Sequence, residues 1–600
     1  MSISAEYARE HQQEPAVLCC RTEAGTVIKA HNLEDPAIFD DLVDSNLLDL
    51  TGCLSIRQVL GARLTQTCDS LTALTRQVLE GVQELPEAEP APAAEEEKTP
   101  AALPAAGGVL RIDIAEGKDI HIEIPLGGVS AAVSNTAAAV PAAPDQPPRL
   151  VRSLKRKHFK VTEVRRGPET RLEGTVLYIR EGIEKDCVAS QALVYDLKID
   201  IITPDAYHTY SETIMDVQPI AAKEGESELG SGVTRVLDGV IMMVTGTDAN
   251  GVQIGEFGSS EGYLDENIVW GRPGAPDKGE IFIKTQVTVK EHTNMERPGP
   301  MAAHAATDVI TQEIREALKK AGDELVVSEE TFEQYRRPGK KKVVIVKEIM
   351  GQGAMHDNLI LPVEPVGVLG AKPNVDLGNV PVAVSPLEVL DGCIHALTCI
   401  GPASKEMSRH YWREPLVLAA LQDEELDLCG VIFVGSPQIN AEKFYVSRRV
   451  GQWCEMLDVD GAFVTTEGFG NNHIDFASHH EQIGMRGIPV VGLSFCAVQG
   501  ALVVGNKYMT HMVDMNKSAS GIENEVLACN TLCPEDALRA IQMLKNAMAG
   551  EPVKAAEKKW NPEVKAANLQ AMEAATGKRI ETELNEQSLP MSQKRREKYD

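Results

Sequence analysis

Five short apolar runs in the C-terminal half constrain the fold of this chain more than any other feature. They are rich in Val and Ile and cover residues 342–347, 380–384, 430–434, 461–465 and 489–493. Strands of this composition are buried on both faces, which is typical of a parallel sheet. Because helical patterns separate the runs, the sequence predicts a doubly wound, mostly parallel α/β domain over residues 340–550.

The last helix of this domain has clear start signals. Pro534 stands at its predicted first position and is followed by two acidic residues. Leu538, Ile541 and Leu544 recur at helical spacing and form its predicted apolar face. Residues 551–600 are predicted to be a polar tail.

The rest of the chain divides into several predicted parts. Residues 84–106 are rich in Pro, Ala and Glu, and residues 131–149 in Ala and Pro, so both are predicted linkers. The folded parts are a small N-terminal domain over 1–83, a β-hairpin over 107–130 and a β-rich domain over 150–335. The β-rich domain has alternating strand patterns near 174–179, 193–202, 239–244 and 281–289, then a terminal helix over 306–320 with Gly322 as its C-cap.

Composition and charge exclude several classes of partner. The chain has a net charge of −29 and only 4% aromatic residues, which argues against nucleic acid and anionic lipid as ligands. The most apolar stretch, 488–505, is interrupted by Pro, Gly and Gln, so no membrane span is predicted. The polar N-terminus has no secretory pattern, and most of the twelve cysteines lie in apolar runs. We therefore expect buried, reduced thiols, Cys429 and Cys496 among them, in a cytoplasmic protein that binds small molecules or other proteins.

Polar, mostly Gly-rich segments follow several of the predicted strands, at residues 350–358, 435–438, 466–473 and 494–495. Ligands of open parallel sheets bind at the carboxyl ends of the strands. Glu467, Asn471, Asn472 and His473 are therefore candidates for substrate binding or proton transfer. Tight turns without a ligand explain any one of these segments equally well. No nucleotide site is predicted, because His473 interrupts the Gly-x-Gly-x-x-Gly pattern.

The histidines near this segment suggest a metal site as one hypothesis. His473, His479 and His480 stand close to Glu481, but their spacing matches no His-Glu-x-x-His pattern, and the chain has no Cys-x-x-Cys. Solvated or hydrogen-bonded histidines are the preferred interpretation, and no metal is predicted.

The segment from residue 390 to residue 414 is unusually rich in reactive side chains. It contains Cys399 among small residues, followed by Lys405, Arg409, His410 and Arg413. Cationic groups near a thiol lower its pKa and make it nucleophilic. From residue types alone, however, a buried thiol followed by a charged helix face explains the segment as well.

The same segment carries a family resemblance. Residues 395–406 read HALTCIGPASKE and residues 408–415 read SRHYWREP. With VTTEGFGNNHIDF at 464–476 and AVLCCRTE at 16–23, they strongly resemble the pyruvoyl-forming proproteins of the D-proline reductase family. They are more distantly similar to component B proproteins of glycine, sarcosine and betaine reductases. The resemblance covers essentially the whole chain, least distinctively at the two linkers, and the Thr398–Cys399 pair is intact.

The resemblance implies that the chain cleaves itself between Thr398 and Cys399. The Cys399 thiolate attacks the Thr398 carbonyl to form a thioester, and elimination and hydrolysis then leave a pyruvoyl group at position 399. The implied reaction opens the ring of D-proline to 5-aminopentanoate, with a selenolate from a separate selenoprotein subunit as nucleophile and a thiol reductant. The pyruvoyl group is the only cofactor implied, and the two fragments are expected to stay associated in a hetero-oligomer.

The chemistry suggests roles for four neighbouring residues. Arg409 or Arg413 could hold the proline carboxylate through two hydrogen bonds. His395 or His410 could transfer protons during processing or catalysis.

Several alternative functions stay open at this point. A component-B-type reductase would act on another amine, such as glycine, sarcosine or betaine, and a pyruvoyl decarboxylase would need no selenoprotein. A non-catalytic scaffold subunit would not be processed, and the intact cleavage pair argues against that alternative.

Overall fold

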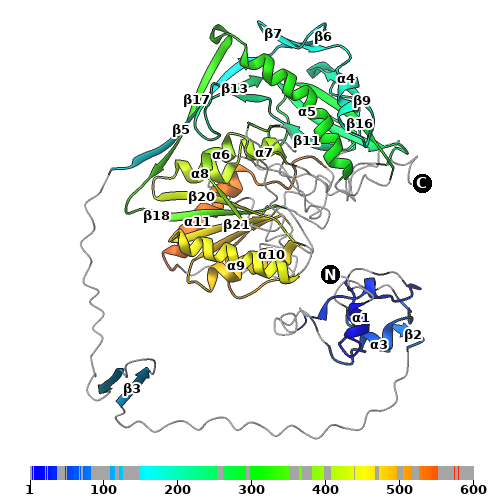
Figure 1. Ribbon diagram of the computed structural model, residues 1–600, viewed down its shortest axis with the longest axis vertical. Coiled ribbons are helices and arrows are strands. Elements are labelled where there is room, and N and C mark those ends of the chain that lie inside the picture. Colours follow the sequence, from blue (N-terminus) through cyan, green and yellow to red (C-terminus); the bar gives the residue numbers. More distant parts are fainter. Residues whose placement is uncertain are drawn as a thin grey trace.

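The computed structural model describes most of the chain (Figure 1). The described residues are 3–82 with short gaps, the backbone of 109–114 and 120–125, and residues 147–252, 261–291, 298–349, 364–367, 381–396, 407–437, 440–466, 472–495, 504–515, 526–551, 570, 573–574 and 579. The protein is a mixed α/β protein with strands in several sheets. None of its described helices is both long enough and apolar enough to cross a membrane.

A six-stranded sheet forms the centre of the C-terminal part. Its strands are β18 Lys341–Glu348, β19 Val382–Val384, β20 Leu426–Val434, β21 Gly461–Thr466, β22 Val490–Ser494 and β23 Met512–Asp514. Their order across the sheet is β19-β20-β18-β21-β22-β23. β18 pairs in parallel with β20 on one side and with β21 on the other, so the strand order reverses at β18. The five predicted strands are present, and β23 is a sixth that the sequence did not indicate.

The prediction of a parallel strand at 380–384 is wrong. Strand β19 lies at the edge of the sheet and runs antiparallel to β20, with Val382 opposite Phe433. Its Val382 and Val384 are half-buried and Ala383 is exposed, whereas the interior strands are buried almost throughout. Parallel strands are connected by helices that cover the faces of the sheet. An antiparallel edge strand is common on such sheets, because it pairs with one neighbour only.

Helices cover both faces of this sheet, as the packing of strand β18 shows. Successive side chains of a strand point to opposite faces. Val343 and Ile345 pack in one core with α8 Pro415–Gln422 and α11 Pro534–Met548. Val344 and Val346 pack in a second core with α9 Asn440–Met456 and α10 Asn472–Gly484 (Figure 1). The uninterrupted apolar run of β18 therefore reflects burial on both faces.

Helix α11 begins at Pro534 as predicted, but its buried face differs from the prediction. The buried apolar side chains are Ala537, Ala540, Ile541 and Leu544. Leu538 is 48% exposed, so its assignment to the apolar face is wrong. The two small alanines let the helix approach the sheet closely, and Leu538 follows Ala537 by about 100° around the helix, which turns it toward solvent.

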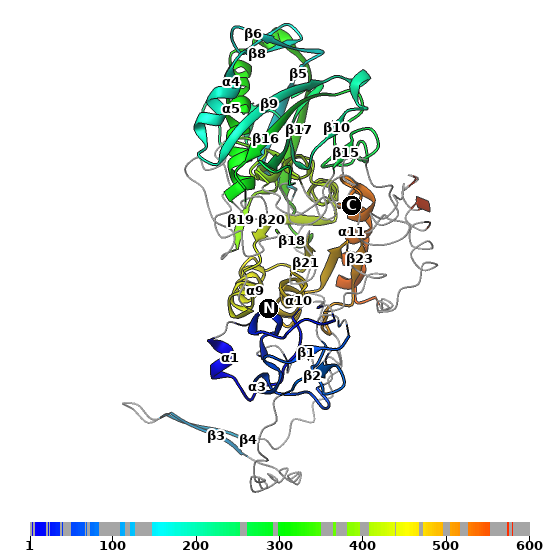
Figure 2. The same cartoon turned by 90° about the vertical axis from the view of Figure 1, so that its right-hand side faces the viewer.

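Three sheets of three or four strands, a short two-stranded sheet of β10 Tyr210–Ser211 and β15 Gly262–Tyr263, and a long helix form the central part, which lies above the six-stranded sheet in Figure 2. The sheets have the orders β12-β13-β5-β17, β11-β14-β16-β9 and β6-β8-β7. The strands are β5 Arg149–Lys160, β6 Glu163–Gly167, β7 Arg171–Glu173, β8 Val176–Arg180, β9 Val194–Ile202, β11 Ile214–Gln218, β12 Ala221–Lys223, β13 Gly232–Asp238, β14 Val240–Asp248, β16 Ile281–Val289 and β17 Val326–Arg336. The strands expected from alternation near 174–179, 193–202, 239–244 and 281–289 correspond to β8, β9, β14 and β16.

The helix of this part, α5 Pro298–Lys319, begins earlier than the expected residue 306. It is followed by β17, which pairs antiparallel with β5, so a strand and not this helix comes last. Gly322 has a φ of −75°, so it is not the left-handed C-cap that the sequence suggested. Its extended backbone leads the chain into β17 instead.

The N-terminal part is built from short elements. The apolar pattern around residues 54–64 forms a single helical turn, α3 Ile56–Val59, followed by strand β1 Arg63–Leu64, which pairs with β2 Leu79–Glu80. The hairpin expected over 107–130 corresponds to β3 Val109–Ile114 and β4 Ile120–Pro125, with Ile112 opposite Ile122. The predicted linkers and the polar tail lie outside the described residues, apart from a few positions.

Buried polar contacts join the central sheets to the six-stranded part. On β5, the Arg156 guanidinium lies 3.8 Å from the Trp412 ring centre and donates a 2.9 Å hydrogen bond to the Trp412 carbonyl. On β12, Lys223 Nζ lies 2.7 Å from a carboxylate oxygen of Asp391. These contacts converge on the chain around α6 Pro386–Leu390 and α7 Ser408–Trp412, the region in which the sequence places the reactive segment.

Candidate functional site

The chain on either side of residues 397–406 is held in place, although these ten residues lie outside the described part. Thr398 and Cys399 lie within residues 397–406, which are outside the described part of the chain. Residues 391–396 precede this gap, and α7 follows it. The Ala396 backbone N–H donates a 2.8 Å hydrogen bond to Ser408 Oγ. The two ends of the segment that carries the predicted cleavage pair are therefore bonded to each other.

A buried carboxylate on β11 holds Ser408. Asp216 Oδ1 accepts a 2.9 Å hydrogen bond from the Ser408 backbone N–H, and Asp216 Oδ2 accepts a 2.6 Å bond from the Ser408 hydroxyl. Gln218 Nε2 donates a further 2.9 Å hydrogen bond to Asp216 Oδ2. Asp216 is fully buried, and burial raises its pKa to about 6, although the hydrogen bonds from Ser408 and Gln218 lower that pKa.

His395 belongs to the same network. Its Nδ1 lies 2.6 Å from the Gly367 carbonyl oxygen, and its Nε2 lies 3.0 Å from Gln218 Nε2. A carbonyl only accepts and an amide nitrogen only donates, so this geometry requires the proton on Nδ1 and a lone pair on Nε2. Asp308 on α5 lies 3.8 Å from Nε2. Both ring nitrogens of His395 are thus engaged, which suits orientation of the chain better than free proton transfer.

The residue before Gly367 is a backbone outlier. Val366, next to Gly367, has a φ of +43°, which is rare for a β-branched residue. Its backbone N–H donates a 2.8 Å hydrogen bond to the Gly392 carbonyl, and its own carbonyl accepts from Arg315. The surrounding contacts therefore hold a strained backbone against the chain that leads to the cleavage pair.

Arg409 and Arg413 do not present unoccupied guanidinium groups. Arg409 is 3% exposed and forms two hydrogen bonds with Glu280, at 2.6 and 2.7 Å. Arg413 forms two hydrogen bonds with Asp277, at 3.1 and 2.7 Å, and Arg409 contributes a third at 3.1 Å. Burial raises the pKa of Asp277, but the two arginines outweigh it, and the net shift is downward. A substrate carboxylate would have to displace Asp277 or Glu280 to bind either arginine in two places.

The residues of α7 do not form a solvent-facing surface. All five residues of α7 are buried, including Arg409 and His410. His410 Nε2 lies 2.9 Å from a carboxylate oxygen of Glu414, and the same oxygen lies 3.1 Å from Lys347 Nζ at the end of β18. His410 therefore belongs to a fully buried group of three ionisable residues, held between α7 and the sheet.

A second polar cluster lies at the carboxyl ends of the parallel strands, on the α9 and α10 side. We define the sheet-end cluster as Glu348, Ser436, Lys443, Thr466 and Asp475, all of which are buried. Lys443 and Ser436 both contact Asp475 Oδ2, and Lys443 Nζ lies 2.7 Å from Ser436 Oγ. Thr466 donates a 3.3 Å hydrogen bond to Glu348.

Two buried carboxylates share one buried cation in this cluster. Burial, with the Asp475 charge, raises the pKa of Glu348 well above its usual range. Burial also raises the pKa of Asp475 to about 6, against the effect of Lys443. Because the strand order reverses at β18, the cluster lies where ligands of open α/β sheets bind.

The predicted residues near α10 are brought partly into this region. Asn472 and His473 begin α10 and are buried, and burial lowers the pKa of His473 to about 4, so its ring is neutral at pH 7. Glu467 and Asn471 lie outside the described residues. His479 is buried with its Nε2 at 3.8 Å from Glu348, whereas Glu481 is exposed. The histidines and Glu481 therefore do not form one group.

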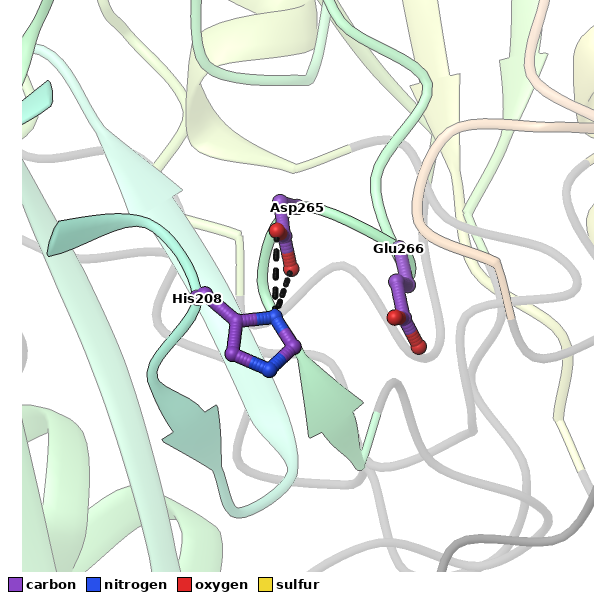
Figure 3. A group of neighbouring side chains, drawn as sticks. All are labelled: His208, Asp265 and Glu266. Atoms are coloured by element: carbon purple, nitrogen blue, oxygen red, sulfur yellow. Dashed lines mark hydrogen bonds and ion pairs between the residues drawn. The ribbon is translucent and has the colours of Figure 1, made fainter. Parts of the chain in front are cut away.

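Among the described residues, one set of side chains has the composition of a metal site. His208, Asp265 and Glu266 place their ligand atoms within 4.8 Å of one another (Figure 3). All three are exposed, His208 Nδ1 lies 3.2 Å from both Asp265 oxygens, and the His208 ring stacks on Tyr263. These contacts explain the arrangement without an ion, and we assign no metal to it.

Among the described cysteines, six are buried, namely Cys68, Cys187, Cys393, Cys454, Cys529 and Cys533, and Cys496 lies outside the described residues. Cys429 is half-buried, so its assignment as a buried thiol is only partly right.

Sequence reasoning missed Asp216, Gln218, Ser408, Glu348, Lys443 and Asp475. The signal available for Asp216 and Glu348 was a charged residue inside or directly after a buried strand, as in Ile-Met-Asp-Val-Gln at 214–218. Such residues are costly to bury without partners.

The comparisons with known proteins agree with the resemblance. The family model of glycine/sarcosine/betaine reductase component B subunits matches residues 152–501. The D-proline reductase proprotein PrdA of Acetoanaerobium sticklandii is 66% identical, with both chains fully covered. The glycine reductase complex component B subunits alpha and beta, and the sarcosine reductase complex component B subunit alpha, both of Peptoclostridium acidaminophilum, are each 25% identical. Each match covers 55% of this chain and 76% of the relative. No solved structure matches the chain.

The chain therefore belongs to the family of glycine, sarcosine and betaine reductase component B subunits. Within that family, its full-length match groups it with the D-proline reductase proproteins.

Proposed function

We propose that this chain reductively cleaves D-proline to 5-aminopentanoate, using a pyruvoyl group that it makes at position 399. The observation that carries the proposal is the 66% identity to a D-proline reductase proprotein over the whole of both chains. The glycine and sarcosine reductase relatives match only about half of this chain, at 25% identity, so another amine is the weaker alternative.

The proposed processing needs only the chain's own residues and water. The Cys399 sulfur attacks the Thr398 carbonyl carbon, and the amide nitrogen takes a proton as the C–N bond breaks and a thioester forms. Loss of the α-proton at position 399 and cleavage of its Cβ–S bond would release the upstream chain as a thiocarboxylate and leave a dehydroalanine. The dehydroalanine would tautomerise to an imine, and hydrolysis of the imine by water would give the pyruvoyl ketone and ammonia. The pyruvoyl group would supply an electrophilic carbonyl that ordinary side chains lack.

The described residues fit a backbone reaction in this segment. Ala396 and Ser408 are bonded across the segment, and Ser408 is in turn bonded to the buried Asp216. A reaction between adjacent residues requires an ordered backbone, because a small displacement of the reacting atoms costs much of the rate.

The order of strands supports the proposal that the two fragments stay associated. Strands β18 and β19 would belong to the upstream fragment, and β20 to β23 to the downstream fragment. β18 lies between β20 and β21 and pairs with both. β19 also pairs with β20, so separation of the fragments would break three strand pairings and expose two apolar cores.

For the substrate site, we propose the carboxyl ends of the parallel strands, near the sheet-end cluster. Asn472 and His473 lie at this edge, and Glu467 and Asn471 are their neighbours in sequence. Arg409 and Arg413 are poorer candidates for the proline carboxylate than the sequence suggested, because Glu280 and Asp277 occupy them. His395 and His410 are better suited to hold the chain than to transfer protons to substrate.

We further propose that turnover requires a separate selenoprotein subunit in a hetero-oligomer in the cytoplasm. This chain would provide the electrophile and no selenolate, so the reducing equivalents must arrive from the partner and a thiol reductant.

The test combines intact mass with substrate trapping. Cleavage predicts fragments of about 22 and 43 kDa from the 65.0 kDa chain, in proportion to their lengths. These fragments should elute together on native gel filtration and separate in denaturant. Borohydride should attach labelled D-proline to the first residue of the small fragment. Cys399→Ala should stay uncut and inactive. An active chain that remains at 65 kDa, or equal trapping of glycine, would contradict the proposal.

A further inference from the structure

We propose that Asp216 and Ser408 are positioning residues for self-cleavage, forming a clamp that closes the base of the segment carrying Thr398 and Cys399. This inference rests on the proposed function, because it assumes that the chain is cut at that pair. Its structural basis is the unbroken hydrogen-bonded path from Ala396 through Ser408 to Asp216.

The clamp is close to the reacting bond along the chain. Thr398 is two residues after Ala396, and each residue spans at most about 3.6 Å, so their Cα atoms are at most about 7 Å apart. On the other side, Ser408 begins α7, which is buried throughout. The bond between Ala396 and Ser408 therefore fixes the chain two residues before the proposed cleavage pair.

Each atom of the clamp has one consistent hydrogen-bonding role. The Ser408 hydroxyl accepts from the Ala396 N–H and donates its own proton to Asp216 Oδ2. Asp216 Oδ1 accepts from the backbone N–H groups of Ser408 and Val217, at 2.9 Å each. Four donors in total point at this carboxylate, and only an ionised carboxylate accepts from all of them.

A second path fixes the neighbouring residue. Gln218 Nε2 donates to Asp216 Oδ2 and also faces His395 Nε2 at 3.0 Å. Since Asp216 and Gln218 both lie on β11, this strand holds His395 directly and Ala396 through Ser408.

The positioning role follows from the proposed chemistry. The thiolate of Cys399 must approach the carbonyl of the preceding residue, and an unrestrained segment would spend most of its time in other conformations. The clamp also survives the cut. Asp216 and Ala396 would belong to the upstream fragment and Ser408 to the downstream one, so the new chain ends remain joined at their base.

The test measures the rate of self-cleavage in the full-length chain after pulse-labelled synthesis. Ser408→Ala and Asp216→Asn should slow conversion of the 65 kDa chain at least tenfold. Ser408→Thr keeps a hydroxyl that can accept and donate, and should restore the rate to within about threefold of wild type. Melting temperatures are recorded for every variant.

Thr285→Val is the matched control. The Thr285 hydroxyl is buried in the same sheet as Asp216 and bonds to Thr307 at 2.9 Å, away from Ser408. It should lower stability by a comparable amount without slowing the cut. If Thr285→Val slows cleavage as much as Ser408→Ala does, or if Ser408→Thr recovers the melting temperature but not the cleavage rate, the clamp is overturned.

Cys399→Ala separates this inference from the proposed function. If wild type is never cut, or if Cys399→Ala is cut, the proposed processing fails whatever the clamp variants do. If wild type is cut and Cys399→Ala is not, wild-type rates in both Ser408→Ala and Asp216→Asn refute the clamp alone.

Discussion

Replacing Lys443 with methionine tests the electrostatics of the sheet-end cluster. Lys443 is fully buried and is the cation that faces Asp475, with Glu348 close enough for the three charges to interact. Methionine keeps the length of the side chain and removes its charge. Leaving a buried carboxylate without its partner costs about 3–5 kcal/mol. For a domain of this size, that loss corresponds to a drop in melting temperature of roughly 10 °C.

The loss should depend on pH in a defined direction. Burial raises the folded-state pKa of Asp475 to about 6, above its usual 3.8, so the stability contributed by its protonated form is lost as pH rises toward 6. Lys443 limits that loss, and without it the folded-state pKa rises further. The difference in melting temperature between Lys443→Met and wild type should therefore be largest above about pH 6 and should shrink below it.

The assay is a series of thermal melts between pH 5 and pH 8, with Lys342→Met as the matched control. Lys342 lies on β18, and its partner Asp458 is almost fully exposed, so its pair is worth at most about 1 kcal/mol. Equal melting temperatures of Lys443→Met and wild type at pH 8, or a difference that does not change with pH, would refute the reasoning.

Three further predictions concern neighbouring parts of the fold. Arg409→Lys and Arg413→Lys should each lose a two-point carboxylate contact, and Arg409→Lys should lower the melting temperature more, since Arg409 is the more buried; trapping of D-proline by the processed chain should change little, and a selective loss of trapping in one variant would restore that arginine as a substrate ligand. Leu544→Ala should cost about 2–5 kcal/mol in thermal or denaturant unfolding and Leu538→Ala less than about 0.5, because only Leu544 is buried; equal losses would contradict the observed helix face. Gly392→Ala should cost at least about 1–2 kcal/mol, because Gly392 has a φ of +78° and a Cβ would lie 2.9 Å from the Val366 backbone nitrogen; an unchanged melting temperature would show that this turn is not formed as described.

The sequence alone determined much of the strand pattern and the candidate reaction. Residues buried on both faces of a sheet must be apolar throughout, so the runs at β18, β20, β21 and β22 were readable without coordinates. The family resemblance likewise depends on short stretches of sequence around residues 395–415 and 464–476. Both signals depend only on residues that are close together in the sequence, so they can be recognised without the fold.

The tertiary structure decided which charged residues have partners. Arg409 and Arg413 looked like candidate carboxylate ligands in the sequence, but the fold places Asp277 and Glu280 against them. The packing of α11 against the sheet also leaves Leu538 exposed to solvent. Hydrogen bonds and ion pairs act over a few ångströms, so their partners depend on how distant segments pack.

Asp216 shows this dependence most clearly. It lies 192 residues before Ser408, and its chemical environment exists only once β11 packs against α7. Burial then raises the pKa of the carboxylate, and the surrounding donors fix its orientation while opposing that rise. No periodicity or motif in the sequence predicts this contact. The hydrogen bonds between Asp216 and Ser408 stabilise the protein only when both segments are packed together and removed from water.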